Sequence, residues 1–164
     1  MRKRIAALIC VMLLCMSSAF AGSYTAKDGG ALFTLRYDEK QFALDQYSYL
    51  GSSMNGTWFF ILYDAQYTID CGAEYTDRGG MTDGYAQAVC QAVDGKMVEM
   101  YEAGGREFVI VSAQRQDVGQ VYYAETVVGG RAVYFEIYDM RTGVAGEACL
   151  QTLKTVLDGF MPLQ

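Results

Sequence analysis

Two Gly-Gly-Arg turns, each between segments of alternating polarity, constrain the fold of this chain more than any other feature. They lie at Gly104-Gly105-Arg106 and at Gly129-Gly130-Arg131. Glycine adopts positive φ without a steric penalty, so two glycines between alternating segments predict a tight primed turn. The second half of the chain is therefore expected to form two consecutive antiparallel hairpins.

The positions of the turns also predict which side chains share a face. If Val128 and Arg131 close the second hairpin, Ala124 faces Phe135 on an apolar side. The opposite side then carries Tyr123, Glu125, Tyr134, Glu136 and Tyr138. In the first hairpin, one side carries Tyr101 and Phe108, and the other carries Val98, Met100, Val109 and Val111. Because both of its sides are apolar, we expect other elements to cover both faces of the sheet.

The remaining elements follow from periodicity. Strands are predicted at Phe33–Tyr37, at Trp58–Tyr63 and over 67–74, and a turn at 38–40 is predicted to return the chain along 41–44. A helix is expected from Thr82 or Asp83 to about Val93. A second helix follows Thr142 and ends at Gly159. Its apolar stripe consists of Leu150, Leu153, Val156, Leu157 and Phe160.

This pattern predicts an α+β fold, with an antiparallel sheet of about six to eight strands flanked by helices. The alternative is a curved sheet around one helix, of the cystatin-like or NTF2-like form. A stretch of 143 residues, from Gly22 to Gln164, is the size of one ordinary domain. With one proline and no linker-like stretch, a second domain is not expected.

The first 21 residues have the pattern of a secretory signal peptide. Arg2, Lys3 and Arg4 precede a short apolar core, and Ala19-Phe20-Ala21 is a small-x-small cleavage site. The apolar core is too short for a stable membrane span, which needs about 20 residues. We therefore expect a secreted or extracytoplasmic protein without a membrane span in its mature chain.

Charge and composition exclude several classes of function. Without the three basic residues of the leader, 10 basic residues remain of 13, against 19 acidic ones, a net charge of −9. Nucleic acids and anionic membranes bind basic patches, so neither is an expected partner. The chain has no histidine, which removes Ser-His-Asp and Cys-His catalysis and histidine-containing zinc sites. No phosphate-binding glycine motif is present, and no cofactor is expected.

The cysteines beyond the leader are Cys71, Cys90 and Cys149, and no C-x-x-C motif is present. An odd count in an oxidising compartment leaves two possibilities open. A helix folded back over its own strand would bring Cys90 level with Cys71, which favours a Cys71–Cys90 disulfide. Three free thiols are the alternative.

The order of elements resembles the PsbP-like superfamily. The resemblance is carried by the opening Phe33-Thr34-Leu35-Arg36-Tyr37-Asp38-Glu39, by the Gly104-Gly105-Arg106 hairpin and by the amphipathic segment Cys149 to Phe160. It covers nearly all of the chain after the leader. It implies an αβα sandwich around an antiparallel sheet, used in many members as a non-enzymatic binding scaffold. It transfers no functional residue to this chain.

The face with Tyr123, Glu125, Tyr134, Glu136 and Tyr138 is the leading candidate for a binding site, because tyrosine offers large contact area with a polar end. Tyr47 and Tyr49, in a predicted loop, are further candidates. The competing interpretation places these tyrosines at a seam between helix and sheet. Two other hypotheses are a glycosidase-like pair of Glu125 and Glu136, and a calcium site among Asp64, Asp70, Glu74, Asp77 and Asp83.

The function that these observations favour is an exported, non-catalytic binding or accessory domain for a protein or small-molecule partner. The alternatives are an extracytoplasmic hydrolase that uses carboxylates alone, and a small-ligand-binding domain.

The leader generates the first testable prediction. Because its charged start, apolar core and Ala-Phe-Ala site agree, the exported protein is expected to begin at Gly22. Intact mass and N-terminal sequencing of secreted material check this. An uncleaved leader, or a lipid on Cys15, would contradict it.

Overall fold

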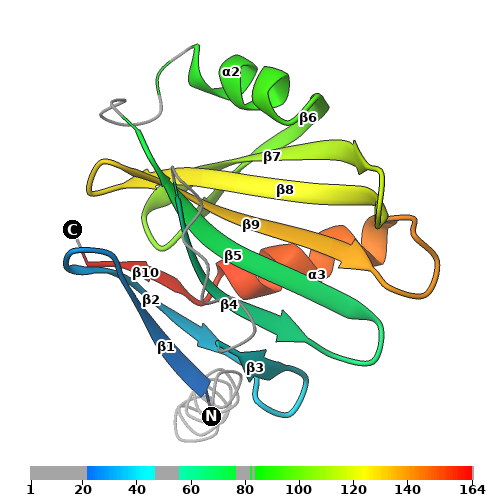
Figure 1. Ribbon diagram of the computed structural model, residues 1–164, viewed down its shortest axis with the longest axis horizontal. Coiled ribbons are helices and arrows are strands. Elements are labelled where there is room, and N and C mark those ends of the chain that lie inside the picture. The colour runs from blue at the N-terminus through cyan, green and yellow to red at the C-terminus, as the bar shows by residue number, and fades with distance from the viewer. Residues whose placement is uncertain (1–21, 47–55, 77–81, 83, 164) are drawn as a thin grey trace, which may run out of the picture.

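The molecule is built around a seven-stranded antiparallel sheet with a second, three-stranded sheet packed beside it (Figure 1). The computed structural model describes residues 22–46, 56–76, 82 and 84–163. The large sheet has the order β3-β4-β5-β9-β8-β7-β6, and the small sheet has the order β1-β2-β10. The strands are β1 (Gly22–Lys27), β2 (Ala31–Tyr37), β3 (Ala43–Asp45), β4 (Gly56–Tyr63), β5 (Tyr67–Tyr75), β6 (Gly95–Ala103), β7 (Arg106–Arg115), β8 (Gly119–Val128), β9 (Arg131–Asp139) and β10 (Phe160–Pro162). The helices within the described ranges are α2 (Tyr85–Ala92) and α3 (Glu147–Leu157).

Both predicted hairpins are confirmed. Gly104 and Gly105 have φ of 59° and 72°, and Gly129 and Gly130 have φ of 55° and 75°, as a primed turn requires. Val128 pairs with Arg131 and Ala124 pairs with Phe135, so the register of β8 and β9 is the predicted one.

The two faces of the large sheet are covered by different elements, which confirms the predicted α+β fold. One face packs against α3 and the small sheet and forms the larger hydrophobic core. The other face packs against α2, with Tyr85, Val89 and Val93 over valines of β7 and β8. Because the helices lie on opposite faces, the alternative of a curved sheet around a single helix is wrong.

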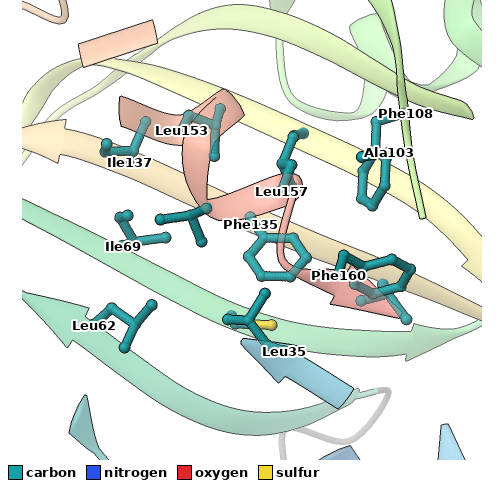
Figure 2. Packing of buried hydrophobic residues seen from close by; sticks show 14 of the residues in the cluster. Leu35, Leu62, Ile69, Ala103, Phe108, Phe135, Ile137, Leu153, Leu157 and Phe160 are labelled. Atoms are coloured by element: carbon teal, nitrogen blue, oxygen red, sulfur yellow. The ribbon is translucent and has the colours of Figure 1, made fainter. Parts of the chain in front are cut away.

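The core beneath α3 depends on the predicted helical stripe. Leu150, Leu153, Val156 and Leu157 are all buried, and the last two turns of α3 lie over Phe135 and Ile137 of β9 (Figure 2). Full burial of one such side chain stabilises the fold by about 2 kcal/mol. Phe160 is also buried, but it belongs to β10 and pairs with Leu35 of β2.

Several local expectations are wrong. The segment 41–44 does not return along β2; its second half forms β3, which pairs with β4. The partners of β2 are instead β1, before it in the chain, and β10 at the end of the described chain. In β6 a bulge lies between Met97 and Glu99, so Met97 rather than Val98 pairs with Val111. Finally, α2 begins after Gly84, which makes no side-chain capping bond.

The predicted Cys71–Cys90 disulfide is also wrong, because both residues and Cys149 are free thiols. Cys71 points with Ile69 into the core beneath α3. Cys90 belongs to α2 and packs against the opposite face of the sheet. Strand alternation therefore separates the two sulfur atoms by the sheet itself. Burial raises the pKa of Cys149 to about 12 and that of Cys71 well above its usual value.

The β6–β7 turn provides a matched pair of substitutions. A Cβ atom on Gly104 would lie 2.1 Å from the carbonyl oxygen of Phe160, whereas nothing lies within 4 Å of one on Gly105. Both glycines have positive φ, so Gly105→Ala is expected to cost about 1 kcal/mol of unfolding free energy through backbone strain alone. Gly104→Ala is expected to cost about 2 kcal/mol more, because β10 must shift.

Chemical denaturation of the two variants checks this expectation. Equal losses of stability would show that the turn does not pack against β10 as described.

Candidate functional site

The predicted binding residues on β8 and β9 do share one face of the sheet, the face that carries α2. Tyr123 is paired with Glu136, and Glu125 is paired with Tyr134. Tyr138 continues the same alternation along β9. The structure therefore brings these residues together, but it gives them different surroundings.

Tyr123 and Glu125 belong to the seam between α2 and the sheet. Tyr123 is 8% exposed, and its hydroxyl donates to Glu125 Oε2 at 2.5 Å. The hydroxyl of Tyr85, in the first turn of α2, donates to Oε1 of the same carboxylate. Burial, followed by the charge of Glu125, raises the pKa of Tyr123 well above its ordinary value, so its hydroxyl remains a donor. These groups attach the beginning of α2 to the sheet.

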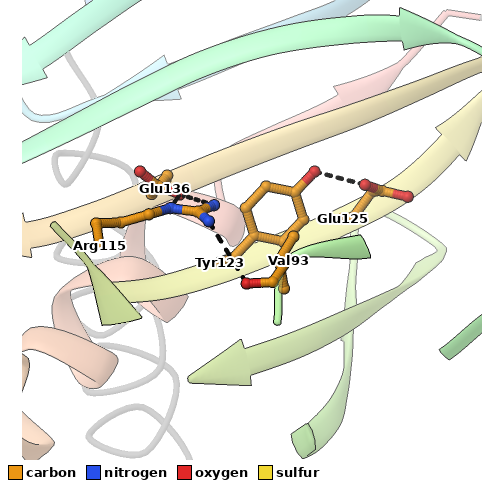
Figure 3. Close-up of polar contacts among 5 residues, drawn as sticks. All are labelled: Val93, Arg115, Tyr123, Glu125 and Glu136. Carbon is orange, nitrogen blue, oxygen red and sulfur yellow. Dashed lines mark hydrogen bonds and ion pairs between the residues drawn. The ribbon is translucent and has the colours of Figure 1, made fainter. Parts of the chain in front are cut away.

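Arg115 attaches the other end of α2 (Figure 3). Its Nε and Nη2 atoms donate to Glu136 Oε2 at 3.0 and 2.6 Å, and Nη1 donates to the carbonyl oxygen of Val93 at 3.5 Å. Val93 is the C-terminal cap of α2. Glu136 is thus an anchor for the arginine as well as a surface acid. No signal in the sequence indicated a role for Arg115, although strand alternation with Val111 and Ala113 places it on this face.

Beside the seam, five half-buried residues form what we call the polar-aromatic face. They are Trp58 of β4, Asp70 of β5, and Tyr134, Glu136 and Tyr138 of β9. The ring of Trp58 meets the ring of Tyr134 edge-on at 5.7 Å, and Tyr134 in turn stacks on Tyr123 at 5.5 Å. Burial raises the pKa of Tyr134 above its ordinary value.

A glycine in β5 makes room for the aromatic part of this face. Gly72 is the register partner of both Trp58 and Tyr134. A Cβ atom on Gly72 would lie 2.5 Å from the hydroxyl oxygen of Tyr134. The two rings meet above a strand position that only a residue without a side chain fits.

Asp70 is the unusual acid of the face. Its Oδ1 atom is buried and has no hydrogen-bond partner among the described residues. Burial, then the negative charges of Glu136 and Asp117, raises its pKa from 3.8 to about 6. From the sequence, Asp70 was a candidate only as one member of the acidic cluster considered for calcium.

A hollow of about 460 Å³ lies at the end of this face. Tyr138, Asp117, Val118 and Met140 contribute to its wall. Asp139 also borders it, but this carboxylate accepts hydrogen bonds from Gln66 Nε2 and from the backbone amides of residues 141 and 142. Those donors, the side chain of Gln66 first, lower the pKa of Asp139 and give it a structural role in the turn.

The other candidates from the sequence have less support. Tyr47 and Tyr49 lie outside the described residues, as do Asp77 and Asp83 of the acidic cluster. Asp64 accepts bonds from the backbone amides of Gln66 and Tyr67 and braces a turn. In the described ranges, no group of three or more metal-ligating side chains lies close enough to hold an ion.

The glycosidase-like pair also has structural partners, because tyrosine hydroxyls donate to Glu125 and Arg115 donates to Glu136. Among the helices of the described segments, none is long and apolar enough to span a membrane.

Comparison with known proteins supports the fold. A solved structure that this chain resembles is the solution structure of cyanobacterial PsbP (CyanoP) from Synechocystis sp. PCC 6803, with a TM-score of 0.53 and 11% sequence identity. The similarity covers 88% of this chain and 93% of that one. No family model and no curated protein matches the sequence. The chain therefore has a PsbP-like fold, as the order of its elements predicted.

The attachment of α2 can be tested at Tyr85. Tyr85→Phe removes the hydroxyl that donates to Glu125 and keeps the ring, which is 2% exposed. A buried hydrogen bond to a charged group contributes about 1.5 kcal/mol or more, so amide hydrogen exchange in α2 is expected to accelerate about tenfold.

Tyr63→Phe is the control, because that residue is 44% exposed and lies on β4. If both variants exchange like the original protein in α2, the Tyr85–Glu125 contact does not hold the helix.

Proposed function

We propose that this PsbP-like chain is an exported, non-catalytic binding domain that holds a protein partner on the polar-aromatic face. The observation that carries the proposal is the set of half-buried aromatic and acidic side chains beside α2, on strands fixed by the core beneath them. Aromatic side chains on a rigid scaffold are the usual anchors of protein interfaces. The signal-peptide pattern of residues 1–21 supports export.

The charge of the face supports a partner with basic groups. Asp70 and Glu136 lie on it and Asp117 lies beside it, whereas the guanidinium of Arg115, which contacts the face, is already bound to Glu136. The chain after the leader also has a large excess of acidic residues. Opposite charges on the two surfaces speed their encounter and select against acidic competitors.

The decisive experiment measures partner binding by variants of the face. The domain from Gly22 to Gln164 is immobilised, a partner is isolated from the envelope or medium of the source organism, and its affinity is then measured with purified components. Tyr138→Ala, alone and combined with Tyr134→Ala, is expected to weaken binding tenfold or more, since an interface aromatic contributes about 2 kcal/mol. Circular dichroism and thermal unfolding establish that each variant is folded.

Tyr75→Ala is the matched control. Tyr75 is 75% exposed and lies at the end of β5, where strand alternation directs it to the opposite face. Equal loss of binding in the control and in Tyr138→Ala would refute the assignment to this face. Hydrolysis of a cell-wall or glycan substrate that is lost in Glu125→Gln or Glu136→Gln would refute a non-catalytic role.

A small-molecule ligand is the second candidate, and the hollow beside Tyr138 favours it. Its volume of about 460 Å³ lies within the range of small-ligand pockets. A ligand there contacts Tyr138 and Asp117 and leaves Tyr134 untouched. Loss of binding in Tyr138→Ala with full binding in Tyr134→Ala is the result that distinguishes this candidate from a protein interface.

A further inference from the structure

Two carboxyl groups lie directly opposite each other on the polar-aromatic face. Asp70 of β5 is the register partner of Glu136 of β9, and both side chains project toward the side of α2. Directly opposed residues of an antiparallel pair have Cβ atoms about 5 Å apart, and like charges at such positions destabilise the sheet. If both groups are ionised, the sheet holds two negative charges side by side.

The two carboxyl groups are not equivalent. Glu136 accepts two hydrogen bonds from Arg115, both at Oε2, and so has a stable counter-charge. Asp70 has no counter-charge among the described residues, and its Oδ1 atom is buried without a donor. A protonated Asp70 carries an O–H donor, and Glu136 is the acceptor opposite it in the register. The proton would therefore reside on Asp70.

We propose that Asp70, opposite Glu136 in the sheet, holds a proton in weakly acidic solution and releases it as the pH rises toward neutrality, so that the polar-aromatic face gains one negative charge. The assignment of the proton to Asp70 rests on the register of β5 and β9 and on the buried Oδ1 atom, unpaired among the described residues, and it does not depend on the proposed function. Its effect on partner binding rests on the function proposed above. A partner with basic groups is bound more tightly when the proton has left.

The other charged and titratable groups around Asp70 are compatible with this switch. From β9, Tyr134 and Tyr138 flank Glu136, and phenols are neutral in this range of pH. β4 places Ile61 opposite Asp70, with Tyr63 further along the strand.

Asp117, after β7, adds a negative charge that acts in the same direction as Glu136. Arg115 acts in the opposite direction, but its guanidinium is bound to Glu136.

The sign of the pH dependence follows from the raised pKa of Asp70, about 6 in the folded chain against 3.8 as its ordinary value. Between these values the folded state binds more protons than the unfolded state, so this group makes the fold less stable as the pH rises. Its stabilising contribution is complete below about pH 4 and is lost as the pH rises through 6. The unfolding equilibrium constant is expected to increase by up to about a hundredfold over that range.

The direct test is a carboxyl ¹³C NMR titration of the unmutated domain from Gly22 to Gln164. The Asp70 resonance is expected to titrate with a midpoint near pH 6. A midpoint below about 4.5 overturns the proposal, because it is close to that of an ordinary aspartate.

The same proton also affects how the free energy of unfolding depends on pH. Asp70→Asn replaces the protonated carboxyl by a neutral amide of the same shape, so the variant is expected to match the original protein below about pH 4 and to be more stable at pH 8. Asp117→Asn is the control: it removes one nearby acid but leaves the opposed pair, and its stability profile is expected to keep the inflection near pH 6. Parallel profiles of Asp70→Asn and the original protein would overturn the proposal.

Partner affinity separates the switch from the proposed function. With the partner isolated as above, affinity is expected to rise through the midpoint of Asp70 and to be independent of pH over this range in Asp70→Asn. A partner that binds equally at pH 5 and pH 8 overturns the regulatory role. A stability profile of the original protein that has no inflection near pH 6 overturns the proton site. A chain that binds no partner at any pH refutes the proposed function and leaves the NMR midpoint unchanged.

Discussion

The packing of one phenylalanine ring connects the two sheets and fixes the orientation of everything described above. Phe135, in the centre of the large sheet, contacts the rings of Phe33, Phe60, Phe108 and Phe160, which come from β2, β4, β7 and β10. A shift of β9 by one residue would place Tyr134 or Glu136 in this cluster, at the cost of burying a hydroxyl or a charge. The core thus determines which side chains of β9 reach the opposite face.

The sequence allowed prediction of those parts of the fold that depend on neighbours in the chain. The register of β8 and β9 follows from the Gly129-Gly130 turn, and the buried stripe of α3 follows from helical spacing. The pairings of β3 with β4 and of β10 with β2 have no such local signal, because they join segments that only the tertiary fold brings together. Three-residue strands are also too short to show alternation.

For the candidate site, too, the sequence predicted what depends on neighbours in the chain and missed what depends on the tertiary fold. Alternation placed Tyr123 and Tyr134 on one face, but burial under α2 made Tyr123 a core residue. Trp58 was missed because the irregular register between Trp58 and Phe60 lets both Phe59 and Phe60 enter the core while Trp58 faces the opposite side. Asp70 acquires its register partner, Glu136, only through the pairing of β5 with β9, and the two residues are 66 positions apart in the chain.

Arg115 connects the polar-aromatic face to α2, because it contacts both of them. It donates to Glu136 and also to the carbonyl oxygen of Val93, at the end of the helix. A negative charge on Asp70 strengthens the field that holds the guanidinium over the sheet, whereas a basic group of a partner at the same place competes with it. Tyr85 holds the first turn of α2 through Glu125, so Arg115 is the contact through which either charge would reach the helix, at its last turn. The proposed protonation and the proposed partner binding would therefore both act on the arginine that anchors α2.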